Sequence, residues 1–105
     1  MEFWPAVYGV GVIEIMTFQL RADADVAAFV KFDARVQTEV AYQCEGMLRR
    51  TLGRNADRWL VMQTWATPEA CEAGRHVIES SPLGQRFVEF VDSSTSTVEQ
   101  FGAVD

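Results

Sequence analysis

Two runs of this chain, residues 10–20 (VGVIEIMTFQL) and 57–65 (DRWLVMQTW), are mostly apolar on both of the faces that a β-strand would present. Successive side chains of a strand point to opposite sides of its sheet, so such a strand is covered on both sides. The two runs are therefore predicted to be the central strands of a sheet. Residues 47–54 and 95–101 also have strand patterns but are more polar, which is typical of edge strands.

Helix signals lie between these strands. The stretch RADAD at residues 21–25 offers two aspartates as N-caps for a helix that reaches about Gln43 and is ended by Gly46. Residues 67–69 (TPE) start a second helix, and Ser81 before a proline repeats the start signal, so a break is predicted there. The order β-α-β-β-α-β predicts a ferredoxin-like α+β fold with a four-stranded antiparallel sheet whose first and third strands are central.

The predicted helices cover only one face of this sheet, yet the other face is also apolar. It carries Ile13 and Ile15, together with either Trp59 and Trp65 or Leu60 and Met62. An exposed apolar surface of that size usually marks an interface. The sequence therefore predicts a homodimer that is closed sheet against sheet.

Length and charge exclude several classes of function. The 105 residues are expected to form a single domain, 1–105, with residues 1–9 as an N-terminal extension. A net charge of −6 argues against binding nucleic acid through its phosphates. The N-terminal residues lack a basic group and are interrupted by Pro5 and Gly9, so we expect a cytoplasmic protein without membrane contact. Cys44 and Cys71 are expected to be reduced thiols, and no metal-ligand spacing is present.

One acidic residue of the first helix, Asp33, falls on its apolar side. A lone carboxylate there is costly unless it is paired or protonated. Asp33 either makes a structural hydrogen bond or ion pair, for example with an arginine, or lies in water on a tilted helix, or faces a ligand. In the last case it would accept a proton from a phenol or enol, with Gln37 one turn further along as its hydrogen-bond partner. The apolar side consists of Ala22, Val26, Phe29, Val36 and Val40.

Three further residues are candidates for a site. Glu14, on an apolar face of the first strand, either approaches Asp33 across one cavity or pairs with an arginine of the neighbouring chain or strand. Trp65, at the end of its strand, is either a pocket wall or a core or interface residue. His76, the only histidine, is expected on the outer side of its helix beside Glu72, so it is not proposed as a catalyst or ligand.

Three segments of the sequence carry a resemblance to a known family: residues 46–52 (GMLRRTL), 57–74 (DRWLVMQTWATPEACEAG) and 80–87 (SSPLGQRF). With the predicted strand order, they resemble the dimeric α/β-barrel superfamily and, within it, the antibiotic biosynthesis monooxygenase-like proteins. The superfamily includes cofactor-free monooxygenases that oxidise polycyclic phenols to quinones, haem-degrading enzymes and small isomerases. The resemblance implies a dimeric barrel and leaves the chemistry to the site residues.

The family's functional positions are only partly retained. Haem-degrading members have a tryptophan and a histidine where this chain has Ala73 and Leu83. Phenol-oxidising members have an asparagine and a tyrosine where it has Val61 and Cys71, whereas Trp65 is kept.

These features together predict a monooxygenase-like protein, without metal or cofactor, that acts on a small planar aromatic or polyketide-like compound. Its expected catalytic residues are Asp33, Gln37 and Glu14. Trp65, Phe29 and Met62 are expected to contact this small hydrophobic molecule. The alternative is a non-catalytic small-molecule-binding domain, or a domain that acts only through its dimer.

Overall fold

The computed structural model describes residues 11–104, so the expectations for residues 1–10 lie outside it. It has a four-stranded sheet in the order β2-β3-β1-β4, and all neighbouring strands are antiparallel. The ferredoxin-like α+β prediction is confirmed, with β1 and β3 at the centre. The elements are β1 (Val12–Leu20), α2 (Val26–Glu39), the 3-10 helix η1 (Ala41–Gln43), β2 (Met47–Asn55), β3 (Arg58–Trp65), α3 (Pro68–Ser80), α4 (Pro82–Phe90) and β4 (Val91–Gly102).

Side-chain caps start the helices where the sequence predicts them. Asp25 accepts a hydrogen bond from the Ala28 amide (3.0 Å), and Thr67 caps α3 in the same way. Ser81 forms the corner between α3 and α4, because its hydroxyl donates to the Ile78 carbonyl (2.7 Å) and accepts from the Gly84 amide (2.9 Å). The corner is so tight that a Cβ at Gly84 would lie 1.9 Å from the carbonyl oxygen of Ile78.

Two element boundaries differ from the prediction. The first helix ends at Glu39 and continues as a separate 3-10 turn, η1, before Gly46, which has a φ of +84°. The last strand begins at Val91, directly after α4, rather than at residue 95. Val91 pairs with Leu20, and an irregularity in the β1–β4 register absorbs the additional residues.

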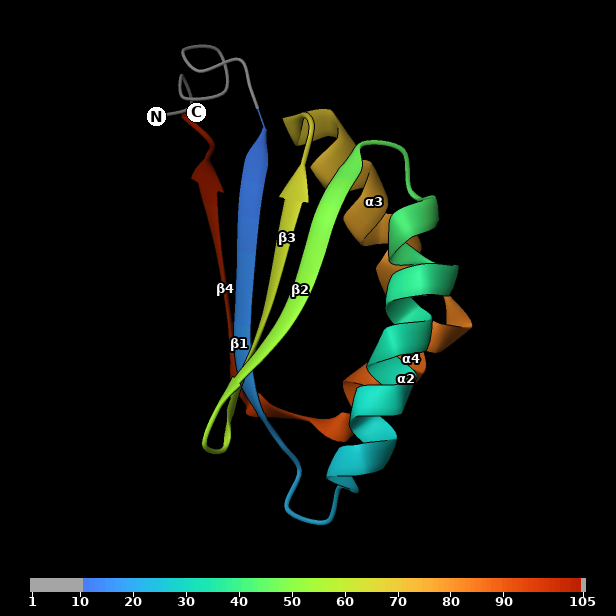
Figure 1. Cartoon of the computed structure of the whole chain (residues 1–105), viewed down its shortest axis with the longest axis vertical. Coiled ribbons are helices and arrows are strands. Elements are labelled where there is room, and N and C mark those ends of the chain that lie inside the picture. Colours follow the sequence, from blue (N-terminus) through green and yellow to red (C-terminus); the bar gives the residue numbers. More distant parts are fainter. Residues whose placement is uncertain (1–10, 105) are drawn as a thin grey trace.

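All three α-helices lie on one side of the sheet (Figure 1). The alternating burial of β3 shows that Trp59, Val61, Gln63 and Trp65 face the helices. Leu60 and Met62 therefore lie on the opposite face, which settles the choice left open by the sequence. Ile13, Ile15 and Phe101 lie on that face as well, since their cross-strand partners do.

The apolar core beneath the helices consists of two clusters. The larger is built around Phe29, whose ring lies edge-on to Trp59 at 5.0 Å between centroids; its other buried members are Phe18, Val36, Val61, Phe87 and Val91. The smaller contains Val12, Trp65 and Cys71. A polar row separates the two clusters along the strands.

Candidate active site

Four polar residues form one row across the whole sheet, on the face that the helices cover. Arg50 of β2 is opposite Gln63 of β3, Gln63 is opposite Glu14 of β1, and Glu14 is opposite Gln100 of β4. Arg50, Gln63 and Glu14 are buried, while Gln100 is on the exposed edge strand. The cross-strand register thus brings together side chains that are up to 86 positions apart in the sequence.

The hydrogen bonds of this row converge on Glu14 from both sides. Arg50 Nε donates to Gln63 Oε1 (3.1 Å), and Gln63 Nε2 donates to Glu14 Oε1 (3.1 Å). Gln100 Nε2 donates to the other carboxylate oxygen of Glu14 (3.0 Å). Since Gln63 lies between a cation and an anion, its amide has only one favourable orientation.

A charged side chain from a helix meets each end of the buried row. Asp33 of α2 accepts two hydrogen bonds from the Arg50 guanidinium, at 2.8 Å from Nη2 and 3.1 Å from Nη1. This ion pair is almost fully buried, at 3% exposure for Asp33 and 5% for Arg50. Arg75 of α3 lies 3.6 Å from Glu14 and is partly exposed. Each buried charge therefore has a partner of opposite sign.

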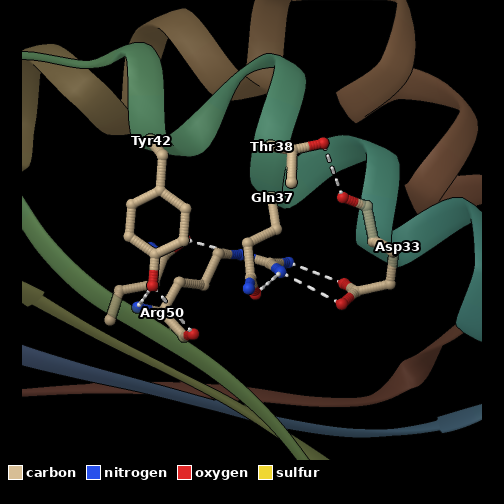
Figure 2. A network of polar contacts seen from close by, with 7 residues as sticks. Asp33, Gln37, Thr38, Tyr42 and Arg50 are labelled. Carbon is tan, nitrogen blue, oxygen red and sulfur yellow. Dashed lines mark hydrogen bonds and ion pairs between the residues drawn. The ribbon is translucent and has the colours of Figure 1, made fainter.

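Arg50 is held by further contacts, as Figure 2 shows. Nη1 also donates to the side-chain oxygen of Gln37 at 3.4 Å. The hydroxyl of Tyr42, from η1, accepts from the backbone amide of Arg50 (2.8 Å) and donates to its carbonyl (3.3 Å). The guanidinium lies over the ring of Phe87, 5.9 Å from its centroid. Side chain and backbone are thus fixed from α2, η1, β3 and α4.

A cavity of about 260 Å³ lies between the polar row and the α3–α4 corner. Glu14, Arg50 and Gln63 provide its polar floor, and Arg75 and Glu79 are its other charged residues. The rest of the lining is mainly apolar: Met16, Val36, Val61, Ile78, Phe87, Val88 and Val98. An apolar chamber with a few convergent polar groups is the usual form of a small-molecule site.

The predicted site residues fall in different places. Glu14 lines the cavity, and its arginine partner is Arg75 of helix α3 rather than the predicted arginine of a neighbouring chain or strand. Asp33 forms the predicted ion pair with an arginine, and both of its oxygens face that guanidinium rather than the cavity. Gln37 accepts a hydrogen bond from Arg50, and within residues 11–104 no side-chain hydrogen bond joins it to Asp33.

The three predicted apolar contacts are not part of the cavity lining. Phe29 and Trp65 have no exposed surface and belong to the two core clusters. Met62 faces the opposite side of the sheet, because the side chains of β3 alternate around the inward-facing Val61 and Gln63. Within the part of the chain that is described, the indole nitrogen of Trp65 has no hydrogen-bond partner.

Sequence reasoning missed Arg50, Gln63 and Arg75 as site residues. The only signal for Arg50 and Gln63 in the sequence was that each is a polar residue within a strand. The only signal for Arg75 was its position along α3. Their importance depends on the partners that they meet across the sheet and across the gap to the helices.

The thiol of Cys71 lies close to the polar row, and Gln100 Nε2 approaches its sulfur at 3.8 Å. Burial, reinforced by the negative charge of Glu14, raises the pKa of Cys71 to about 11. Burial also raises the pKa of Cys44. Both thiols are free.

Two further observations concern residues 11–104. No three histidine, cysteine, aspartate or glutamate side chains come together there in a way that could hold a metal ion. Nor is any helix in this range both long and apolar enough to cross a bilayer.

Solved structures with the same architecture include proteins described as oxygenases. SnoaB, a cofactor-independent oxygenase from Streptomyces nogalater, superimposes with a TM-score of 0.72 at 17% identity over 91% of this chain and 95% of that one. A candidate antibiotic biosynthesis monooxygenase from Caulobacter crescentus gives 0.68 at 18% identity, over 96% and 97% of the two chains. Rv0793 from Mycobacterium tuberculosis gives 0.67 at 19% identity, over 90% and 96%.

No protein-family model and no curated protein matches the sequence. The structural likeness confirms the resemblance first indicated by residues 46–87: the chain has the fold of the antibiotic biosynthesis monooxygenase-like proteins.

Proposed function

We propose that the protein is a cofactor-independent monooxygenase that acts on a small planar aromatic or polyketide-like compound. The main support is the cavity itself, in which an apolar chamber meets a floor of buried charged and amide groups. The described oxygenase activity of SnoaB, a protein of the same fold, agrees with this proposal. Fold alone does not define chemistry, whereas the residues that line a site do.

Glu14 is assigned the role of proton acceptor, because it is the buried carboxylate that lines the cavity. It would take the proton of a phenol or enol, and the resulting anion would pass electrons to dioxygen. In the overall reaction a ring CH₂ group becomes a carbonyl, and O₂ supplies the carbonyl oxygen. The second oxygen atom leaves as water with the two hydrogens of the CH₂ group.

Asp33 is assigned an indirect role, because Arg50 lies between its carboxylate and the cavity. It would keep the guanidinium in place while Glu14 exchanges the proton. Gln37, which also contacts Arg50, would act in the same way.

We also propose that two copies of the chain associate through the uncovered face of the sheet. That face carries Ile13, Ile15, Leu60, Met62 and Phe101, and Phe101 is 46% exposed. Burying these side chains against a second copy would remove a continuous apolar surface from water.

The activity can be tested by following oxygen uptake with 1,8-dihydroxy-9-anthrone, a planar phenol with one oxidisable CH₂ group. We expect the protein to consume one O₂ for each anthraquinone formed, faster than the blank. Glu14→Gln should reduce this rate by about 10²-fold or more, whereas Glu72→Gln, on the exposed side of α3, should not change it. If the compound binds but is not oxidised faster than in the blank, the protein is a binding domain rather than an oxygenase.

A further inference from the structure

We propose that Arg50 determines the specificity of the cavity by donating one N–H to a neutral acceptor oxygen of the ligand, such as a ketone or quinone carbonyl. Asp33 is the positioning residue that makes this possible. The inference uses the cavity assigned under the proposed function but does not require that the ligand is oxidised.

The hydrogen bonds of Arg50 leave one donor unused. A guanidinium has five N–H groups. Nε donates to Gln63, Nη1 donates to both Asp33 and Gln37, and Nη2 donates to Asp33. Those contacts, taken over residues 11–104, occupy four N–H groups and leave the second N–H of Nη2.

The direction of this remaining N–H follows from the planarity of the group. Nη2 is the terminal nitrogen on the same side as the Nε–H bond, so its second N–H runs alongside the hydrogen bond from Nε to Gln63. Arg50 and Gln63 both line the cavity. A ligand oxygen placed beside the Gln63 amide would therefore meet this donor and complete the guanidinium's set of partners.

The local charge balance favours a neutral acceptor over an anion. The positive charge of Arg50 is already matched by Asp33, at 2.8 and 3.1 Å. Glu14 lies on the same floor and is opposed by Arg75. A carboxylate ligand would add an uncompensated negative charge to a half-open, mainly apolar chamber, and this is unfavourable. A carbonyl oxygen gains the hydrogen bond without that cost.

The arrangement is also rigid before any ligand binds. Asp33 and Gln37 hold the guanidinium from α2, and Tyr42 fixes the backbone of Arg50 through two hydrogen bonds. Little side-chain freedom remains to be lost on binding, so the free N–H is presented in a fixed place.

Three probes of the same shape test this inference: 2-acetylnaphthalene, 2-ethylnaphthalene and 2-naphthoate. Their dissociation constants can be compared by calorimetry at pH 7.5 without oxygen. Because only the ketone can accept a hydrogen bond from the charged donor, we expect it to bind about tenfold more tightly than the hydrocarbon. The naphthoate should bind more weakly than the ketone by at least a similar factor. Tightest binding of the naphthoate would overturn the inference.

A double variant, Asp33→Leu with Arg50→Met, removes the donor without leaving a buried charge unpaired. It should bind the hydrocarbon as before but lose the preference for the ketone. Arg54→Met is the matched control, because Arg54 is on the same strand but outside the cavity lining, over the ring of Trp59; it should keep the preference. If the double variant does not fold, Arg50→Lys serves instead, since an ammonium lacks the planar fork. A ketone preference that survives either substitution contradicts the inference.

The two proposals fail in different ways. A ketone preference that depends on Arg50, without anthrone oxidation, would leave the inference and refute the oxygenase activity. Oxidation by a protein that binds ketone and hydrocarbon equally would refute the role of Arg50 alone.

Discussion

The buried pair of Asp33 and Arg50 gives the sharpest test of how this fold is stabilised. Three variants form a cycle: Asp33→Leu, Arg50→Met and the two together. Removing one partner of a buried ion pair leaves an uncompensated charge and typically costs about 3–5 kcal/mol of unfolding free energy. Arg50→Met should be at the upper end, because Gln63 and Gln37 lose their donor as well.

The double variant should recover most of this loss. Replacing both charges with apolar side chains of similar volume is often neutral, and can stabilise a protein by about 1–4 kcal/mol. The expected single-variant loss is large compared with a total stability of about 5–15 kcal/mol for a domain. The surrounding side chains, among them Phe87 and Val36, offer an apolar environment to the new residues.

Urea unfolding followed by tryptophan fluorescence measures these differences. A loss of about 3 kcal/mol of unfolding free energy is the minimum expected for a single variant. With an m-value of about 1.5 kcal/mol/M, this loss lowers the urea midpoint by roughly 2 M. Glu39→Gln is the control, because the Arg35–Glu39 pair has a similar separation of 2.9 Å but is about half exposed. Its midpoint should not change measurably.

Two results would refute the reasoning. A midpoint for Asp33→Leu within error of the wild type would mean that the pair is not desolvated. A double variant as unstable as the sum of the two single variants would mean that the residues do not interact.

Three other predictions concern packing, pH and assembly. Gly74→Ala should lower the unfolding free energy by about 1–3 kcal/mol, because the new Cβ would lie 2.1 Å from the buried ring of Trp65. Adding Trp65→Phe should restore part of the lost stability. An unchanged melting temperature for Gly74→Ala would contradict this prediction. Because the pKa of Cys71 rises from 9.0 to about 11 on folding, its contribution to stability is present below pH 9 and lost as the pH rises towards 11. Stability between pH 8 and 11 should therefore fall more steeply for the wild type than for Cys71→Ala, and equal slopes would refute the assignment. Ile15→Glu, on the uncovered face of the sheet, should convert a dimer to a monomer in light scattering. Val30→Glu, at an exposed position of α2, should leave the dimer intact. A monomeric wild type would refute the proposed assembly.

Much of the fold follows from local patterns in the sequence. The two-sided apolar character of residues 10–20 and 57–65 indicated central strands, and Asp25, Thr67 and Ser81 marked helix starts because capping depends on only a few neighbouring residues. The break at residue 81 was predicted for the same reason. The direct passage from α4 into β4 was not, since it depends on pairing between Val91 and Leu20.

The site was predictable only in part. Asp33 and Glu14 could be recognised as polar residues on apolar faces. Arg50 could not be chosen among the four arginines of residues 49–58. Leu48 lies at a register irregularity between β2 and β3, and this decides which arginine of the strand turns towards the helices. A shift of one residue would have directed Arg49 inwards instead, so the choice depends on tertiary pairing rather than local pattern.

The Ser81 corner separates the size of the chamber from its hydrogen-bonding chemistry, two properties that are usually difficult to change independently. The sheet carries the polar floor of the chamber, whereas Ile78 and Val88, on either side of the bend, contribute only bulk to the opposite wall. Larger or smaller side chains at these two positions would resize the chamber and leave Glu14, Gln63 and Arg50 untouched. Divergence among relatives, or redesign in the laboratory, can therefore alter which molecules fit while the recognition chemistry stays the same.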